Sequence, residues 1–349
     1  MKTKKIRLHV LSILTIGILM AWPSFGEAQT GLNKDSVADE MVTWKTNWSN
    51  GIQIKSSDNK YKFKIGGRIM NDWETALSYD QSIRDSLGGA TNGAEFRRAR
   101  FFHSGTIDQY ISYKLQFDFA GGDADLKDAY IKLGDIPYLG SMKIGHFKEP
   151  FGLEELTSSK YISFMARSLT SAFTPSRNTG LMFSDAILGD RMTWAIGAFR
   201  DVNGYGETTD QEHRFHASGR ITSLAFTKGE NLLHLGLAYQ MLKPDNNLIQ
   251  YAQEPETHMQ VDFVNTGDIS DVSSESILGT ELATVIGPFS VQGEYQRATL
   301  SRNIQLSDGN ESIGKSVNHH FTSFYAYASM FLTRGDHRFM MLKTELLAV

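Results

Sequence analysis

The sequence predicts an all-β protein, an antiparallel transmembrane β-barrel. Three features support this: apolar and polar residues alternate, connections alternate between short and long, and aromatic residues lie near the ends of the alternating segments. The clearest alternation is at 111–119, where Ile, Tyr, Leu and Phe occupy the odd positions and Ser, Lys, Gln and Asp the even ones. Because successive side chains of a strand point to opposite faces, this segment has one apolar and one polar wall. In a membrane barrel the polar wall faces the lumen.

Residues 1–28 have the features of a signal peptide. A basic start at positions 2–7 precedes an apolar run at 10–22, and Ala28 ends a small-residue pattern suited to cleavage. The alternative is an uncleaved membrane anchor. Removal of this segment changes the net charge from −4 to −7, because it takes away Lys2, Lys4, Lys5, Arg7 and Glu27.

Residues 29–50 are polar, which predicts an irregular N-terminal leader, and residues 51–333 carry the barrel pattern. The pattern predicts about thirteen strands, each bounded by turn residues. They are expected at 61–75, 95–107, 110–120, 125–133, 141–147, 178–184, 191–200, 213–226, 231–242, 257–264, 276–286, 289–300 and 321–333.

Connections between these strands differ in length. Two are tight turns, at 108–109 and at Gly287-Pro288. Outer-membrane barrels have short periplasmic turns and long outer loops, so the contrast favours such a barrel over the alternative, a secreted β-sandwich. The long connections are 76–93, 148–177, 243–256 and 301–318.

Composition and motifs argue against other functions. Cysteine is absent, which excludes thiolate metal sites and cysteine nucleophiles. The acidic net charge gives no reason to expect a nucleic-acid partner. His319 and His320 point to opposite faces of a strand, so they do not predict a metal site. With no P-loop, G-x-S-x-G or HExxH motif, we expect no enzyme activity, metal or cofactor.

A cluster of arginines is the best indication of selectivity. Alternation places Arg98 and Arg100 on one face and Arg97 on the other. Because Ala99 and Phe101 suit lipid, Arg98 and Arg100 are predicted to line the lumen, joined by Arg68 from the neighbouring strand. Guanidinium groups present fixed donors to phosphate oxygens, and rings of arginine favour anions.

The run GHFKEPFGLEELTSS at 145–159 is where the chain resembles a known family. It is similar to the start of the long third loop in the porin O/P family, the phosphate-selective porins of bacterial outer membranes. FKIGGR at 63–68, RRAR at 97–100 and LKDAYI at 126–131 resemble strands of the same family, in the same order. The resemblance runs from about residue 51 to Thr333.

This resemblance implies a barrel of the 16-strand porin type, an outer-membrane location contacting lipid, a homotrimer, and passive diffusion of small anions such as phosphate. The family's arginine pathway carries over best to Arg68, Arg98 and Arg100, with Arg214 and Arg220 as weaker candidates. Loop 148–177 is the expected constriction, in which the charged candidates are Lys148, Glu149, Glu154, Lys160, Arg167 and Arg177.

Several alternatives stay open at this point. The arginines could merely balance carboxylates on the barrel wall, for example Asp72, Glu74, Asp118 and Asp128. The chain could be a general porin without phosphate preference, which the net charge of the mature chain favours. It could also be a non-conducting structural protein of the outer membrane.

Residues 334–349 do not follow the family pattern. They show no alternation, so the barrel is expected to lack about three C-terminal strands and to close poorly between its first and last strands. The alternative is a 14-strand relative whose last strand the pattern does not reveal. An open edge in lipid would leave unpaired backbone groups.

Overall fold

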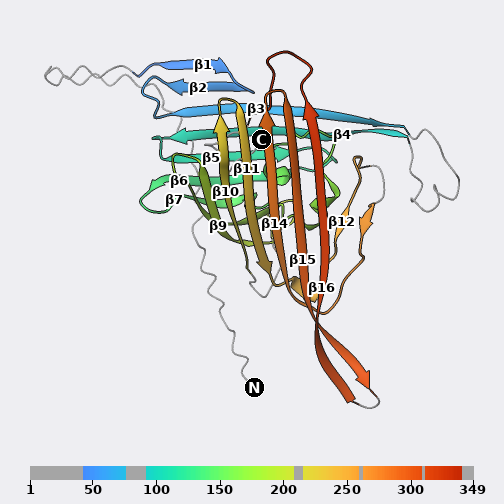
Figure 1. The fold of residues 1–349 in the computed structure, drawn as a ribbon. Coiled ribbons are helices and arrows are strands. Elements are labelled where there is room, and N and C mark those ends of the chain that lie inside the picture. The colour runs from blue at the N-terminus through green and yellow to red at the C-terminus, as the bar shows by residue number, and fades with distance from the viewer. Residues whose placement is uncertain (1–41, 76–91, 208–214, 259–261, 309–310, 340–349) are drawn as a thin grey trace, which may run out of the picture. The chain divides into compact units, whose positions relative to one another are not determined.

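The computed structural model describes residues 42–75, 92–207, 215–258, 262–308 and 311–339. The predicted signal peptide and Arg214 lie outside these residues. One antiparallel sheet of 14 strands contains most of the described chain, and its strands follow one another in chain order (Figure 1). β1 and β16 are the two ends of this order, and no register joins them in the described residues.

The strands of this sheet fall into two runs, one on each side of a long insertion. The first run is β1 (Trp44–Trp48), β2 (Ile52–Ser56), β3 (Lys62–Glu74), β4 (Gly93–Ile107), β5 (Ile111–Asp118), β6 (Asp125–Ile136), β7 (Gly140–Lys148), β8 (Arg177–Ile187), β9 (Met192–Arg200), β10 (His216–Lys228) and β11 (Asn231–Leu242). After the insertion come β14 (Val272–Ile286), β15 (Phe289–Asp308) and β16 (Glu311–Met330).

Short elements lie in the connections. β12 (Ala252–Gln253) and β13 (Val264–Asn265) form a separate two-stranded sheet. The helical turns are α2 (Leu153–Leu156), η1 (Leu169–Phe173) and η2 (Asp245–Asn247). In the described part of the chain, no helix is long and apolar enough to cross a membrane.

The structure corrects three expectations about elements. Of the strand expected at 257–264, the described residues do not join the large sheet; Val264 begins β13, which pairs with β12 of the same connection. The loop expected at 301–318 is instead a long hairpin of β15 and β16, paired from Phe289–Met330 to Asp308–Glu311. The leader predicted as irregular contains β1, which pairs with β2.

The two faces of the sheet differ in chemistry, as the alternation predicts. On β3, Ile65, Ile69 and Trp73 are exposed, while Arg68 and Asp72 between them are partly covered. On β5 the odd positions are likewise apolar and the even positions polar. Because covered polar side chains and exposed apolar ones alternate, the apolar face is the one suited to lipid.

A β-bulge interrupts this alternation next to the arginine cluster. Met70 pairs with Arg98 and Asn71 pairs with Phe96, so Arg97 is an extra residue without a partner in the ladder. A bulge places two consecutive residues opposite one residue of the partner strand and redirects a side chain. Arg97 and Arg98 are therefore both buried on the polar face, which corrects the expectation that Arg97 points the other way.

We expect Gly145→Ala to destabilise the protein. Gly145 has a φ of 130°, and a Cβ there would overlap the carbonyl oxygen of Ala129 on the neighbouring strand β6. Backbone strain of this kind costs about 1–3 kcal/mol, so urea unfolding in detergent should show a loss of that size. The control is Gly134→Ala in β6, where a Cβ would meet Tyr110 at an ordinary 3.5 Å. Equal stability of the two variants would contradict the expectation.

Candidate functional site

The arginine cluster lies on the polar face of β3 and β4. Arg68 on β3 is the register partner of Arg100 on β4, and Arg98 is opposite Met70. The guanidinium of Arg98 interacts electrostatically with those of Arg97, Arg100 and Arg167. The fold therefore brings the three best sequence candidates together, and it adds Arg97, which strict alternation had excluded.

Carboxylates neutralise part of this cluster. Arg100 Nε lies 2.6 Å from Asp118 Oδ2. Arg97 Nη1 lies 2.7 Å from Asp72 Oδ2 and also donates to the carbonyl oxygen of Glu256. These pairs match the alternative in which wall arginines balance wall carboxylates, and they leave less positive charge than the sequence count suggests.

Asp128 joins two further cations of the same wall. Its Oδ1 accepts a hydrogen bond from Arg177 Nε at 2.9 Å, and its Oδ2 lies 2.7 Å from Lys114 Nζ. Arg177, predicted as a residue of the constriction loop, is the first residue of β8 and is held by β6.

Arg220 is held in a different part of the sheet. It forms a two-pronged ion pair with Glu281, with distances of 2.6 Å and 2.9 Å, and both side chains are buried. A bidentate pair of this kind fixes both groups. Arg220 is therefore poorly suited to exchange partners with a passing anion.

Arg68 and Arg98 differ from these paired arginines. Within the described residues, neither forms a salt bridge with a carboxylate. Arg68 instead donates to two hydroxyl groups of the long loop, Ser159 Oγ at 2.5 Å and Ser158 Oγ at 3.5 Å. Arg98 contacts Met70 Sδ at 3.6 Å. In this cluster, Arg68 and Arg98 are therefore the arginines that have no direct carboxylate contact in the described residues.

A buried carboxylate anchors the loop between β7 and β8. Glu149 is fully buried, and its Oε1 lies 2.8 Å from Asn178 Nδ2 and 2.5 Å from His216 Nε2. Its Oε2 accepts a hydrogen bond from Gln240 Nε2 at 3.2 Å. Donors from three strands, β8, β10 and β11, therefore fix the first residue of the loop.

A second wall carboxylate holds the start of α2. The backbone N–H groups of Leu153 and Glu154 donate to Glu294 of β15, at 3.1 Å and 2.7 Å. The first N–H groups of a helix lack partners within it, so a carboxylate there satisfies them. Glu294 was not a sequence candidate, because its loop partners lie about 140 positions away in the chain.

Glu155 is the centre of an ion-pair cluster inside the loop. Its two oxygens lie 3.1 Å from Lys148 Nζ and 3.1 Å from Arg167 Nε. Although burial opposes ionisation, Lys148 and Arg167 lower the pKa of Glu155 to about 2. Arg167 also donates to the carbonyl oxygens of Glu154 and Thr157. Two of the four predicted loop cations, Lys148 and Arg167, therefore hold the loop together.

Glu154 behaves differently from its neighbour. Burial raises its pKa, although its carboxylate accepts hydrogen bonds from the Ser168 backbone at 3.0 Å and hydroxyl at 2.8 Å. It therefore links α2 to the residue just before η1.

Lys160 is the exposed cation of the loop. Its Nζ lies 5.9 Å from the ring centre of Phe102 on β4. Partial burial and the positive charges of Arg68, Lys64 and Lys114 lower its pKa. Lys160 thus faces the same wall as the arginine cluster and adds positive charge there.

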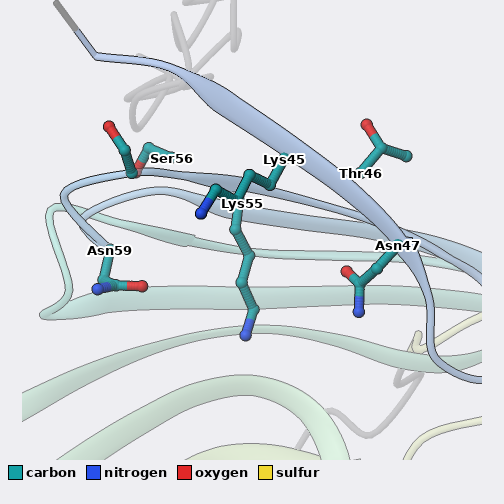
Figure 2. A pocket seen from close by; sticks show the side chains of 7 residues that line it. Lys45, Thr46, Asn47, Lys55, Ser56 and Asn59 are labelled. Atoms are coloured by element: carbon teal, nitrogen blue, oxygen red, sulfur yellow. The ribbon is translucent and has the colours of Figure 1, made fainter.

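Lysines continue this wall toward the short-turn end of the strands. Lys45, Lys55 and Lys62 are register partners across β1, β2 and β3, so their side chains share one face. Lys45 and Lys55 line a hollow of about 690 Å³ together with Asn47 and Asn59 (Figure 2). Lys132 and Lys143 are opposite each other on β6 and β7. Like charges directly opposite destabilise a sheet, so such rows favour an anion between them.

Apolar side chains cover part of the inward side of the sheet at β14 and β15. Phe151 of the loop and Tyr251 of the β11–β14 connection pack with Ile277 of β14 and Leu300 of β15, all buried. The rings of Phe173 and Tyr251 meet edge to face, with their centres 4.6 Å apart. This packing covers part of the inward side of β14 and β15, whereas the arginine cluster lies on the polar face of β3 and β4.

We expect Glu149→Gln to loosen the loop. The amide keeps the size of the carboxylate but places an N–H₂ group against donors, and an unsatisfied buried group costs about 1–3 kcal/mol. Single-channel recordings should show larger and noisier currents than those of the unaltered chain. The control is Asp123→Asn, which removes the same charge from an exposed loop position. Identical currents in the two variants would contradict the anchoring role.

The pKa of Glu155 predicts how acid affects stability. Because it lies below the ordinary value of 4.5, ionised Glu155 stabilises the fold above that pH, and this contribution is lost as pH falls toward 2. In Glu155→Gln, the unfolding free energy should therefore fall less steeply between pH 5 and pH 3, by at most about 1.4 kcal/mol per pH unit. Urea midpoints across this range measure the difference. Parallel curves would show that Glu155 does not titrate as inferred.

Comparisons with known proteins assign the chain to a family. Residues 63–339 match the family of phosphate-selective porins O and P, so the match extends beyond residue 333, where the resemblance was expected to end. Porin O of Pseudomonas aeruginosa is 24% identical over 330 residues, which are 87% of this chain and 71% of that protein. The solved structure of OmpT, an outer membrane protein of Vibrio cholerae in trimer form, is similar with a TM-score of 0.25 and 10% identity, over 77% of this chain and 99% of that one. The family match alone spans most of the sequence, and the chain therefore belongs to the phosphate-selective porin O and P family of outer-membrane proteins.

Proposed function

We propose that this porin conducts small anions by passive diffusion, with phosphate-like solutes preferred. The observation that carries the proposal is that Arg68 and Arg98 lie together on the polar face without a carboxylate partner in the described residues, although arginines around them are paired. Membership of the phosphate-selective porin family also supports a preference for phosphate-like anions. A homotrimeric assembly stays a prediction from the family resemblance.

Loop and wall together can bind an anion without trapping it. Ser158 and Ser159 hold the Arg68 guanidinium in place, so less side-chain freedom is lost when an anion binds. Asp118 and Asp128 on the neighbouring strands reduce the total positive charge. Conduction requires attraction strong enough to draw an ion in and weak enough to release it.

The lysines extend this path toward the short-turn end. Lys64 is on the same face of β3 as Arg68, and the row of Lys45, Lys55 and Lys62 follows. We propose that an anion leaving the arginines moves along these exposed ammonium groups. Ammonium groups are strongly hydrated point charges and form no planar fork, so they suit weak successive contacts.

A general porin without phosphate preference is the second candidate. The pairs Arg100–Asp118, Arg97–Asp72 and Arg220–Glu281 favour it, because each removes one charge from the polar face. Such a channel would conduct chloride and phosphate in proportion to their mobility. The two candidates differ in whether phosphate binds at Arg68 and Arg98.

We expect Arg68→Gln and Arg98→Gln to reduce phosphate binding. Charged hydrogen bonds contribute about 1.5–3 kcal/mol, so the phosphate concentration that half-blocks chloride current should rise roughly tenfold or more. The anion preference measured from reversal potentials in a KCl gradient should also fall. The control is Lys228→Gln, an exposed charge at the end of β10.

Three outcomes distinguish the possibilities. Lost phosphate block in both arginine variants, with the control unchanged, supports a phosphate-preferring channel. Anion preference that falls without any phosphate block in the unaltered chain supports the general porin. Cation preference that neither arginine variant changes would reject the arginine pathway.

A further inference from the structure

On the outward face of β14–β16, the side chains change from apolar to polar at the same distance from the tight turn Gly287-Pro288 on all three strands. Between the tight turn and this boundary, the outward residues are mostly apolar and exposed. They include Ile286 and Leu282 on β14, Phe289 on β15, and Met330 and Phe324 on β16. Farther from the tight turn than this boundary, the outward positions carry hydroxyl, amide, imidazole and guanidinium groups. These are Ser274 and Ser276 on β14, Arg297, Thr299 and Ser301 on β15, and Asn318, His320 and Thr322 on β16.

Register shows that the change occurs at the same height on all three strands. Leu278, Arg297 and Thr322 are neighbours in one row, and Ser276, Thr299 and His320 form the next. A membrane strand crosses the hydrocarbon in about 9–11 residues. Counted from Phe289 at the tight-turn end, this length ends near 297–299, and counted from Met330 it ends near 322–320. Strand length and polarity therefore indicate the same membrane boundary.

This boundary belongs to the outer leaflet. Phe289 follows the tight turn Gly287-Pro288 and pairs with Met330. In outer-membrane barrels the short turns are periplasmic, so the opposite end of the hydrocarbon borders the outer leaflet. Tyr295, one outward position before Arg297, is exposed as expected of an aromatic residue at a membrane interface.

Arg297 is unusual on this face. It is exposed, it lies between Leu278 and Thr322 in its row, and it forms no ion pair within the described residues. Beside it, Thr299 and His320 form a hydrogen-bonded pair at 3.1 Å, and Ser301 donates to Asn318 at 2.9 Å. A lipid-facing arginine is costly in hydrocarbon and much less so at the interface, where an anionic headgroup can meet it.

We propose that Arg297, with the polar groups of Thr299, His320 and Thr322, forms a docking surface for the phosphate of an outer-leaflet glycolipid. The acyl chains would lie along the apolar outward residues of β14–β16, and the phosphate would accept hydrogen bonds from the guanidinium fork. Charge complementarity at the membrane boundary identifies this occupant. The proposal depends on the outer-membrane location and is independent of what the channel conducts.

The experiment measures lipid binding to the full chain in detergent micelles. Native mass spectrometry would follow the bound fraction during titration with lipid A, a bis-phosphorylated glucosamine lipid, and with its dephosphorylated form. The unaltered chain should bind the phosphorylated lipid roughly tenfold more tightly. This comparison needs no substitution, so it tests the proposal even if a variant folds poorly.

Substitutions then locate the site. Arg297→Gln should bring the affinity for lipid A down to that for the dephosphorylated lipid, and Arg297→Lys should retain part of the difference because it keeps the charge but not the fork. The matched control is Arg334→Gln, which removes an exposed arginine just past β16 at the opposite boundary. Equal affinity for the two lipids, or equal losses in Arg297→Gln and Arg334→Gln, would overturn the proposal.

Discussion

The buried carboxylate of Glu149 is the contact on which the arrangement of the site depends. It is the first residue after β7, and Asn178, His216 and Gln240 reach it from three strands. A buried charge is tolerated only when it is fully hydrogen-bonded, so the loop has few ways to leave this position. With its start fixed, the loop can present Ser158 and Ser159 to Arg68 and place α2 against Glu294. In the proposed channel, anion binding at Arg68 therefore depends on a buried contact in another part of the loop.

Pairing, more than the number of arginines, sets the charge along the polar face. Arg100 and Arg220 each have a carboxylate at 2.6 Å, and Asp128 lies between Arg177 and Lys114. A paired arginine stays fixed, and its carboxylate partner cancels most of its positive charge. Arg68 and Arg98 have no such partner in the described residues, so their positive charge is not cancelled in this way. The net charge of the chain, −4, says little about this balance. Its acidic residues include Glu149, Glu155 and Glu294, which hold the loop.

Sequence alternation predicted most of the sheet because a strand with two different environments needs a period of 2. It failed where backbone pairing does not depend on apolar side chains, as in the hairpin at 301–318, whose polar residues still pair along its length. It also failed at Arg97, because one extra residue in β4 moves this side chain to the polar face without a clear sequence signal. The cap formed by Glu294 could not be inferred, since it requires contacts between distant segments. Only the charge of Glu294 at an inward position was a signal.

Asymmetric packing explains why the candidate path follows β1–β8. Phe151, Phe173 and Tyr251 come from two different loops and meet over Ile277 and Leu300, and apolar burial of this kind stabilises by about 25 cal/mol per Å². The same contacts that hold the loops also remove water from the wall of β14–β16. Fixed charges act more strongly where water is restricted on one side. Loop packing and the proposed anion attraction would in this way depend on one arrangement: the apolar wall fixes the loop, and the loop brings its serines and Lys160 to the cationic wall.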